Sequence, residues 1–115
     1  MAEKCVFCDI AVGKIPSDVV YQDEEFLAFR DIQPQAPKHL VIIPKAHISS
    51  LAELTEQQQG FIGRLILLAK EMAEKEGVAT SGYRLAINCG PEGGQLVSHL
   101  HLHLLGGRKL NDQLG

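Results

Sequence analysis

Histidine and leucine alternate in the stretch "SHLHLHLLGG", residues 98–107. Successive side chains of a β-strand point to opposite faces, so this alternation predicts a strand with one apolar face and one histidine face. The leucines would hold the strand against a core. His99, His101 and His103 would then form a row on the other face, with neighbours roughly 6.5 to 7 Å apart.

The rest of the chain predicts further strands and a short first helix. Two β-rich runs, "VVYQ" and "EFLAFR", are separated by an acidic turn and indicate an antiparallel hairpin. The apolar run "HLVIIP" predicts a strand that is buried on both faces, and "YRLAIN", residues 83–88, predicts another strand. Residues 5–13 predict a short helix that ends at Gly13.

A long helix is expected to begin at Thr55 and to end at Glu76. Thr55 and Gln58 have the spacing of a capping box, and Gly77 follows the last helical residue. The apolar side chains of this helix cover more than one face, which predicts that it packs against a second subunit as well as its own sheet. These side chains are Phe61, Ile62, Leu65, Ile66, Leu67, Leu68 and Met72.

Together these elements predict an α+β fold with an antiparallel sheet of about five strands, one long helix and a short N-terminal helix. The chain has 115 residues and no repeat or linker, so we expect residues 1–115 to form a single domain. Its net charge of −3 and its scattered basic residues argue against a nucleic-acid partner. No apolar run approaches the ~20 residues needed to cross a bilayer, and no signal-peptide pattern is present. We therefore expect a cytoplasmic protein with no membrane partner.

Three histidines on one face of a strand favour a functional site, and two kinds of chemistry fit them. His-x-His is a common pair of zinc ligands. Alternatively, a neutral imidazole attacks phosphorus while a neighbouring group protonates the leaving group. The preceding loop "NCGPEGGQ" favours the second, because its backbone N–H groups and the side chains of Asn88 and Gln95 can hold phosphate oxygens.

Several motifs resemble those of one known family. "HLHLHLL", "FRDIQPQAPKHLVIIPKAHI" and "GGQLVSHLHLHLLGGR" are similar to the motifs of the histidine triad (HIT) family of nucleotide-binding proteins and hydrolases. The resemblance extends over nearly the whole chain, and the Gly-Gly-Arg ending resembles the branch that hydrolyses purine nucleoside phosphoramidates. It implies a HIT-like fold, a homodimer, a purine nucleotide substrate of the AMP or GMP type and no organic cofactor.

The resemblance also implies a role for each histidine of the row. His101 matches the nucleophile, which attacks the α-phosphorus and forms a nucleotidyl-histidine that water then cleaves. We expect the carbonyl of His99 to accept the other ring N–H of His101 and so to orient the ring. His103 matches the acid that protonates the leaving amine, and His39 matches the family's relay histidine.

Nucleotide-binding residues are implied in the same way. Asn88, Gly94 and Gln95 match the phosphate contacts, and Asp31 matches the carboxylate that binds the ribose hydroxyls. Leu96 departs from the pattern, because a small hydroxyl residue is common there, and the tail "KLNDQLG" also differs. The slot for the base matches the apolar residues Val6, Phe7, Ile10, Phe29 and Ile32.

Cys5 and Cys8 form a Cys-x-x-Cys pair, which in a reducing compartment suggests a metal or redox pair before a disulfide. Several bacterial members of the family bind a structural zinc through such a pair, the histidine of "PKxHI" and the first triad histidine, which here are His47 and His99. Two thiolates and two imidazoles leave no open position on tetrahedral zinc, so the ion would be structural. The alternative is that the cysteines are buried helix thiols. Cys89 is expected to be a thiol at the edge of a loop.

Three functions therefore remain open. The first is a homodimeric hydrolase that cleaves purine nucleoside 5′-phosphoramidates, which the Gly-Gly-Arg ending favours. The second is a dinucleoside polyphosphate hydrolase or nucleotidylyltransferase, which uses the same nucleophile with a different leaving group. The third is a non-catalytic module that binds a nucleotide or a partner, and the intact histidine triad argues against it.

Overall fold

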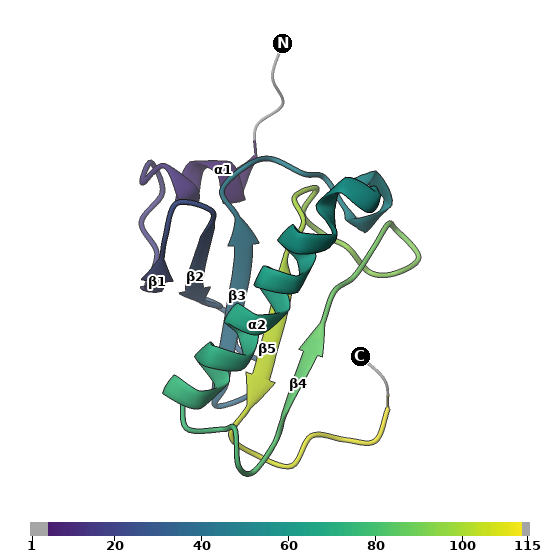
Figure 1. The fold of residues 1–115 in the computed structure, drawn as a ribbon. Helices are drawn as coiled ribbons and strands as arrows, with labels where there is room; N and C mark the ends of the chain where they lie inside the picture. Colours follow the sequence, from purple (N-terminus) through teal and green to yellow (C-terminus); the bar gives the residue numbers. More distant parts are fainter. Residues whose placement is uncertain (1–4, 114–115) are drawn as a thin grey trace.

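Five strands form one antiparallel sheet in the order β1-β2-β3-β5-β4 (Figure 1). The computed structural model describes residues 5–113. The predicted α+β fold, with its five-stranded sheet, long helix and short N-terminal helix, is confirmed. The strands are β1 (Val19–Gln22), β2 (Phe26–Arg30), β3 (Lys38–Pro44), β4 (Tyr83–Ala86) and β5 (Leu102–Gly106), and the α-helices are α1 (Val6–Ala11) and α2 (Gln59–Lys75).

The two faces of the sheet carry two different layers. Helix α2 lies across one face, over β3 and β5, and encloses the larger core, whereas α1 packs against the other face (Figure 1). The register pairs Val41 of β3 with His103 of β5, which puts His103 on the α1 face. Within residues 5–113, none of the helices has the length and apolar character needed to cross a membrane.

The alternating leucines anchor the histidine segment as predicted. Leu100, Leu102 and Leu104 are fully buried. The strand itself is shorter than the pattern predicted, because β5 begins only at Leu102. The neighbouring strand β3 ends at Pro44, which has no N–H to donate to a ladder, and the N–H of Leu100 instead bonds to the carbonyl of Ile48.

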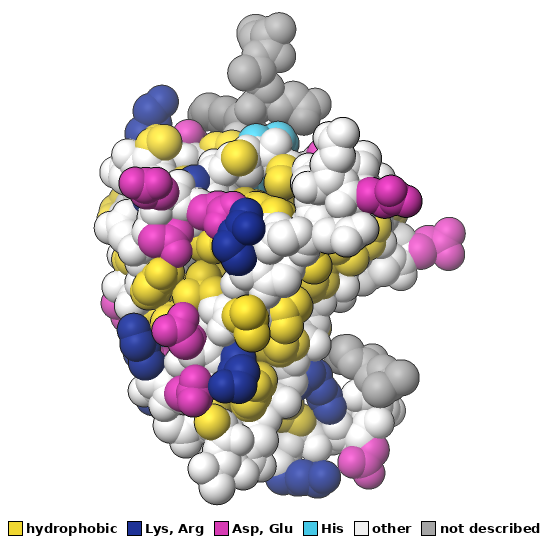
Figure 2. All heavy atoms as spheres, in the orientation of Figure 1, with side chains coloured by type: hydrophobic (Ala, Val, Ile, Leu, Met, Phe, Trp, Pro, Cys, Tyr) yellow, Lys and Arg dark blue, Asp and Glu magenta, His cyan; other side chains and the backbone are white. Residues whose placement is uncertain are grey.

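The long helix begins where the capping box predicted. The backbone N–H of Thr55 donates to Oε1 of Gln58 over 2.7 Å. The first turn is a 3₁₀ helix (Glu56–Gln58), and α2 follows it directly. Leu65 and Met72 are buried, whereas Ile66 is 40% and Leu67 64% exposed, and Figure 2 shows apolar side chains among the charged ones on the α2 face.

A buried carboxylate ties the end of α2 to the two strands that carry site residues. Glu76 accepts two hydrogen bonds from Arg30, at 2.6 and 3.1 Å, and lies 3.8 Å from Nζ of Lys38. Its side chain is only 11% exposed, and its hydrogen bond with Arg30 is the main reason that its pKa is lowered. Arg30 and Lys38 directly precede Asp31 and His39, so this network fixes the strand ends next to the site.

Replacing Glu76 with Gln should lower the free energy of unfolding by about 1 kcal/mol, because Arg30 loses its charged partner but is itself partly exposed and screened. The contribution is present above the unfolded carboxyl pKa of 4.5 and is lost as the pH falls through the lower folded pKa. Urea unfolding at pH 7 and pH 3 measures both effects.

Glu74→Gln is the matched control, because Glu74 lies two residues away and forms an exposed pair with Lys70 at 3.7 Å. Glu74→Gln should lower the free energy of unfolding by no more than about 0.3 kcal/mol. Equal losses for the two variants would show that the contacts of Glu76 with the strands add nothing.

Candidate functional site

A cavity of about 410 Å³ opens on the α1 face of the sheet, between α1 and the glycine-rich loop that precedes β5. Apolar side chains line one part of it and polar groups line the other. The structure brings together here ten residues that the sequence singled out for the nucleotide site: Val6, Phe7, Ile10, Phe29, Asp31, Ile32, Asn88, Gly94, His101 and His103.

The apolar part of this cavity is built around Phe7 of α1. The ring of Phe7 meets the ring of Phe29 edge-on at a centroid distance of 5.6 Å, and that of His101 at 5.0 Å. Ile32 follows β2 and is 91% exposed at the rim. The result is an apolar slot next to a buried imidazole.

His101 is held by one short hydrogen bond. Its Nδ1 lies 2.7 Å from the carbonyl oxygen of His99, and the side chain is 6% exposed. A carbonyl only accepts, so Nδ1 carries the proton, and the lone pair of the neutral ring is on Nε2. This is the orientation that the sequence analysis expected from the carbonyl of His99.

A second hydrogen-bonded chain fixes the protons of the other two histidines. The backbone N–H of Gln35 donates to Nδ1 of His39 at 3.0 Å, so the proton of neutral His39 is on Nε2. That nitrogen lies 2.9 Å from Nδ1 of His103 and 3.5 Å from a carboxylate oxygen of Asp31. His103 therefore accepts at Nδ1 and carries its own proton on Nε2.

Burial keeps this pair uncharged in the free site. It lowers the pKa of His103 to about 4, helped by the positive charges that His101 and His39 carry when protonated and opposed by the carboxylate of Asp31. Burial also lowers the pKa of His39, and Asp31 again opposes it. Both rings are therefore neutral near pH 7.

The loop before β5 holds its shape through Gln95, and this differs from the expected role of that side chain. Oε1 of Gln95 accepts from the backbone N–H of Gly90 at 2.9 Å, while Nε2 donates to the carbonyls of Ser49 and Val97 at 2.7 and 2.9 Å. Gln95 does not line the cavity, whereas its neighbour Gly94, with a φ of 83°, does. These hydrogen bonds stabilise the loop, and the expected contact of Gln95 with phosphate stays a prediction.

Cys5, Cys8, His47 and His99 form a cluster outside this cavity. Their ligand atoms all lie within 4.8 Å of one another. The shortest contacts join Sγ of Cys8 to Nδ1 of His47 at 3.2 Å and Sγ of Cys5 to Nδ1 of His99 at 3.3 Å. His99 is fully buried, and its Nε2 lies 2.8 Å from the carbonyl of Pro44, so its lone pair on Nδ1 faces the cysteines. The four residues have the donor set and the spacing to hold a metal ion.

His99 therefore serves two neighbouring groups through different atoms. Its ring belongs to the cysteine cluster, and only its carbonyl reaches His101. The row of three imidazoles is thus divided between the cluster and the cavity. Cys89, as expected, is an exposed thiol in the loop after β4.

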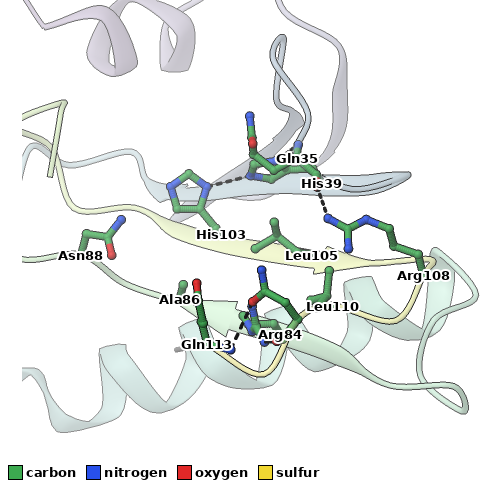
Figure 3. A pocket seen from close by; sticks show the side chains of 11 residues that line it. Gln35, His39, Arg84, Ala86, Asn88, His103, Leu105, Arg108, Leu110 and Gln113 are labelled. Carbon is green, nitrogen blue, oxygen red and sulfur yellow. Dashed lines mark hydrogen bonds between the residues drawn. The ribbon is translucent and has the colours of Figure 1, made fainter. Parts of the chain in front are cut away.

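A second cavity of about 330 Å³ shares His103 and Asn88 with the first (Figure 3). His39 and two arginines also line it, Arg84 from β4 and Arg108 from the segment after β5. Sequence reasoning missed these arginines. The available signal was the position of Arg84 within an otherwise apolar strand.

Comparison with known proteins gives a consistent result. The HIT domain matches residues 12–110. The purine nucleoside phosphoramidase of Escherichia coli K12 is 48% identical over 99% of this chain and 96% of its own length. A 14 kDa zinc-binding protein of Zea mays is 50% identical over 92% of this chain and 84% of its own.

A solved structure extends the match to three dimensions. The crystal structure of a HIT family hydrolase from Legionella pneumophila Philadelphia 1 superposes with a TM-score of 0.95, at 47% identity, and the match covers 97% of this chain and all of that one. The expected family resemblance is confirmed in sequence and in fold, and the chain belongs to the HIT domain family.

Proposed function

We propose that this protein hydrolyses purine nucleoside 5′-phosphoramidates through a nucleotidyl-histidine intermediate. The observation that carries the proposal is the unpartnered Nε2 of His101, which the hydrogen bond to His99 leaves as a lone pair at the cavity wall. The name of the Escherichia coli relative supports the same reaction.

The cavity offers one place for each part of such a substrate. The purine fits the apolar slot beside Phe7 and Phe29, and the carboxylate of Asp31 is available for the ribose hydroxyls. Asn88 and Gly94 both line this cavity; the side-chain amide of Asn88 can donate to phosphate oxygens, whereas the N–H of Gly94 is bonded to the carbonyl of Pro91. This arrangement would hold the phosphorus next to His101.

Attack by Nε2 of His101 on phosphorus forms a P–N bond to the ring as the bond to the leaving amine breaks. The amine must gain a proton as it leaves. A bound phosphate anion favours uptake of one proton by the His39–His103 pair, and Asp31 supports that charge. His103 passes this proton to the amine, then accepts one from the water that cleaves the nucleotidyl-histidine, so protons balance over the cycle.

The acid pair also favours a phosphoramidate over a dinucleoside polyphosphate as substrate. A phosphate leaving group departs as a weakly basic anion and needs no proton, whereas an amine does. Only an amine leaving group therefore needs the proton that the His39–His103 pair can deliver, although cleavage of the intermediate by water uses His103 in both cases. A binding module would need neither this pair nor a free nitrogen on His101.

His101→Ala should reduce kcat by at least about 1,000-fold on both an adenosine 5′-phosphoramidate and the p-nitrophenyl ester of AMP, because both need the nucleophile. For His103→Ala, the rate of nucleotidyl-adduct formation should fall far more with the phosphoramidate than with the p-nitrophenyl ester, because nitrophenolate leaves without a proton. Steady-state rates measure the effect of His101→Ala, and single-turnover rates of adduct formation measure the effect of His103→Ala. AMP affinity, measured by calorimetry, should change little in His101→Ala.

Two results would contradict these roles. One is steady-state cleavage by His101→Ala at a rate near that of the unmodified protein. The other is an equal decrease, for the two substrates, in the rate of adduct formation by His103→Ala, which would mean that this histidine does not protonate the leaving group. Intact mass after a rapid quench should show the nucleotidyl adduct only in proteins that retain His101.

We propose further that the cysteine–histidine cluster holds a structural zinc ion. Two thiolates and two imidazoles match tetrahedral zinc and leave no position for a substrate. The ion would join the first turn of α1 to the segment that carries His101. Because α1 also provides Phe7, the metal would hold one wall of the nucleotide cavity in place. Thiolate ligands fit a reducing compartment such as the cytoplasm.

Protein purified without chelator should contain about one equivalent of zinc, and Cys8→Ser should lose most of it, because a hydroxyl is a poor zinc ligand. Cys89→Ser is the matched control, since Cys89 is exposed and outside the cluster. Elemental analysis measures the content. Less than a tenth of an equivalent in the unmodified protein would rule the site out.

A homodimer is also part of the proposed function. Ile66 and Leu67 leave apolar surface exposed on α2, and β4 is an edge strand of the sheet among the described residues. An exposed apolar helix face beside an open strand edge favours pairing with a second copy. Helix α2 covers one face of this sheet, and β4 forms one edge of it (Figure 1).

Leu67→Glu should weaken the dimer, because it places a charge in the apolar contact. At about 10 μM the unmodified chain of 12.6 kDa should sediment at twice that mass, and the variant mostly as a monomer. Gln57→Glu, which adds the same charge at an exposed position before α2, should remain dimeric. An unmodified protein that sediments as a monomer at this concentration would contradict the proposal.

A further inference from the structure

We propose that the second cavity receives the leaving group, and that Arg84 and Arg108 select amines that carry an anionic group, a carboxylate or a phosphate. This inference rests on the proposed function. It assigns a specificity to the side of the site that lies away from the purine.

The position of the cavity is the first argument. It shares His103 and Asn88 with the nucleotide cavity, whereas His101 lines the nucleotide cavity alone. In a displacement at phosphorus the leaving group departs opposite the nucleophile. An amine that takes its proton from His103 therefore leaves past His103, into the second cavity.

Charge is the second argument. Among the described residues, the cavity wall includes Arg84 and Arg108 and no Asp or Glu. Arg30 and Arg64 pair with carboxylates, but neither Arg84 nor Arg108 forms an ion pair within residues 5–113. A protein with a net charge of −3 thus places two uncompensated cations in one cavity beside the reacting atoms. Such a site attracts anions.

Both guanidinium groups are anchored by backbone carbonyls. Arg84 donates to the carbonyl of Asn111 at 2.7 Å, and Arg108 donates to that of Gln35 at 2.8 Å and to that of Lys109 at 3.1 Å. A guanidinium has five N–H donors, so each group keeps donors for a ligand. The carbonyl contacts orient the two side chains without neutralising their charge. Figure 3 shows Arg84 and Arg108 on two sides of the cavity.

The remaining wall suits the part of the leaving group between its nitrogen and its anion. Leu105 of β5 and Leu110 line the cavity, together with the polar side chains of Gln35 and Gln113. A short aliphatic linker can lie against the two leucines. The volume of about 330 Å³ is large enough for an amino acid or a phosphorylated amino alcohol.

The test uses two pairs of adenosine 5′-phosphoramidates whose amines carry or lack an anionic group. The phosphoramidate of glycine is compared with that of glycinamide, and that of O-phosphoethanolamine with that of ethanolamine. The readout is the ratio of kcat/KM for the anionic substrate to that for its neutral partner, because changes in folding or in the nucleophile cancel in this ratio. The two pairs distinguish a carboxylate from a phosphate.

In the double variant Arg84→Gln/Arg108→Gln, at least one of the two ratios should fall by about threefold to tenfold, since charge-assisted hydrogen bonds are lost at a partly exposed site. Glutamine can still donate to the carbonyls that anchor the arginines. The ratio is compared instead of the rate, because Arg108 also contacts Gln35, whose N–H donates to His39, and any effect on that histidine is shared by the charged and the neutral substrate. Lys70→Gln, which removes one positive charge from the exposed face of α2, should leave both ratios unchanged.

The outcomes separate this inference from the function on which it rests. If the unmodified protein cleaves the phosphoramidates and neither ratio changes in the double variant, the inference is wrong and the proposed function stands. If the unmodified protein cleaves none of the four substrates, the proposed function is wrong and the inference fails with it.

Discussion

The hydrogen bond from His101 to the carbonyl of His99, at 2.7 Å, is the contact on which the site depends. It decides which ring nitrogen holds the proton, and therefore which one faces the cavity with a lone pair. The carbonyl is available because residues 99–101 lie just outside the sheet: β3 ends at Pro44, and β5 begins at Leu102. The interrupted ladder thus provides the acceptor that orients His101.

His99 also couples the candidate metal cluster to the cavity. Its ring is fixed between the carbonyl of Pro44 and the thiols, and its own carbonyl orients His101. Phe7 lies in α1 between the two cysteines, Cys5 at the N-cap and Cys8 in the first turn, and its ring meets the rings of His99 and His101. A disturbance of the cluster would therefore reach His101 through one peptide unit and one aromatic ring.

Local patterns predicted most of the fold and much of the site. Alternation identified the leucine face, and the capping box identified the start of the long helix, because both depend on residues a few positions apart. The limits of β5, the loop-stabilising role of Gln95 and the second cavity were not predictable in this way. Each depends on a contact between distant segments, such as Gln95 with Ser49 or Arg108 with Gln35. Family resemblance supplied the roles of Asp31 and His39, whose spacing alone carries no such signal.

Burying an imidazole costs free energy unless its ring nitrogens have hydrogen-bond partners, and in this site those partners fix which nitrogen of each ring carries the proton. Among the described residues, every side-chain nitrogen or oxygen that is itself shielded from solvent has a hydrogen-bond partner, whereas Nε2 of His101 has none and is accessible from the cavity. The amide of Gln35 sets the proton of His39, which in turn sets that of His103. The carbonyl of His99 sets that of His101. What these backbone contacts leave facing the cavity is one lone pair on His101 and one N–H on His103, the two groups that displacement of an amine at phosphorus requires.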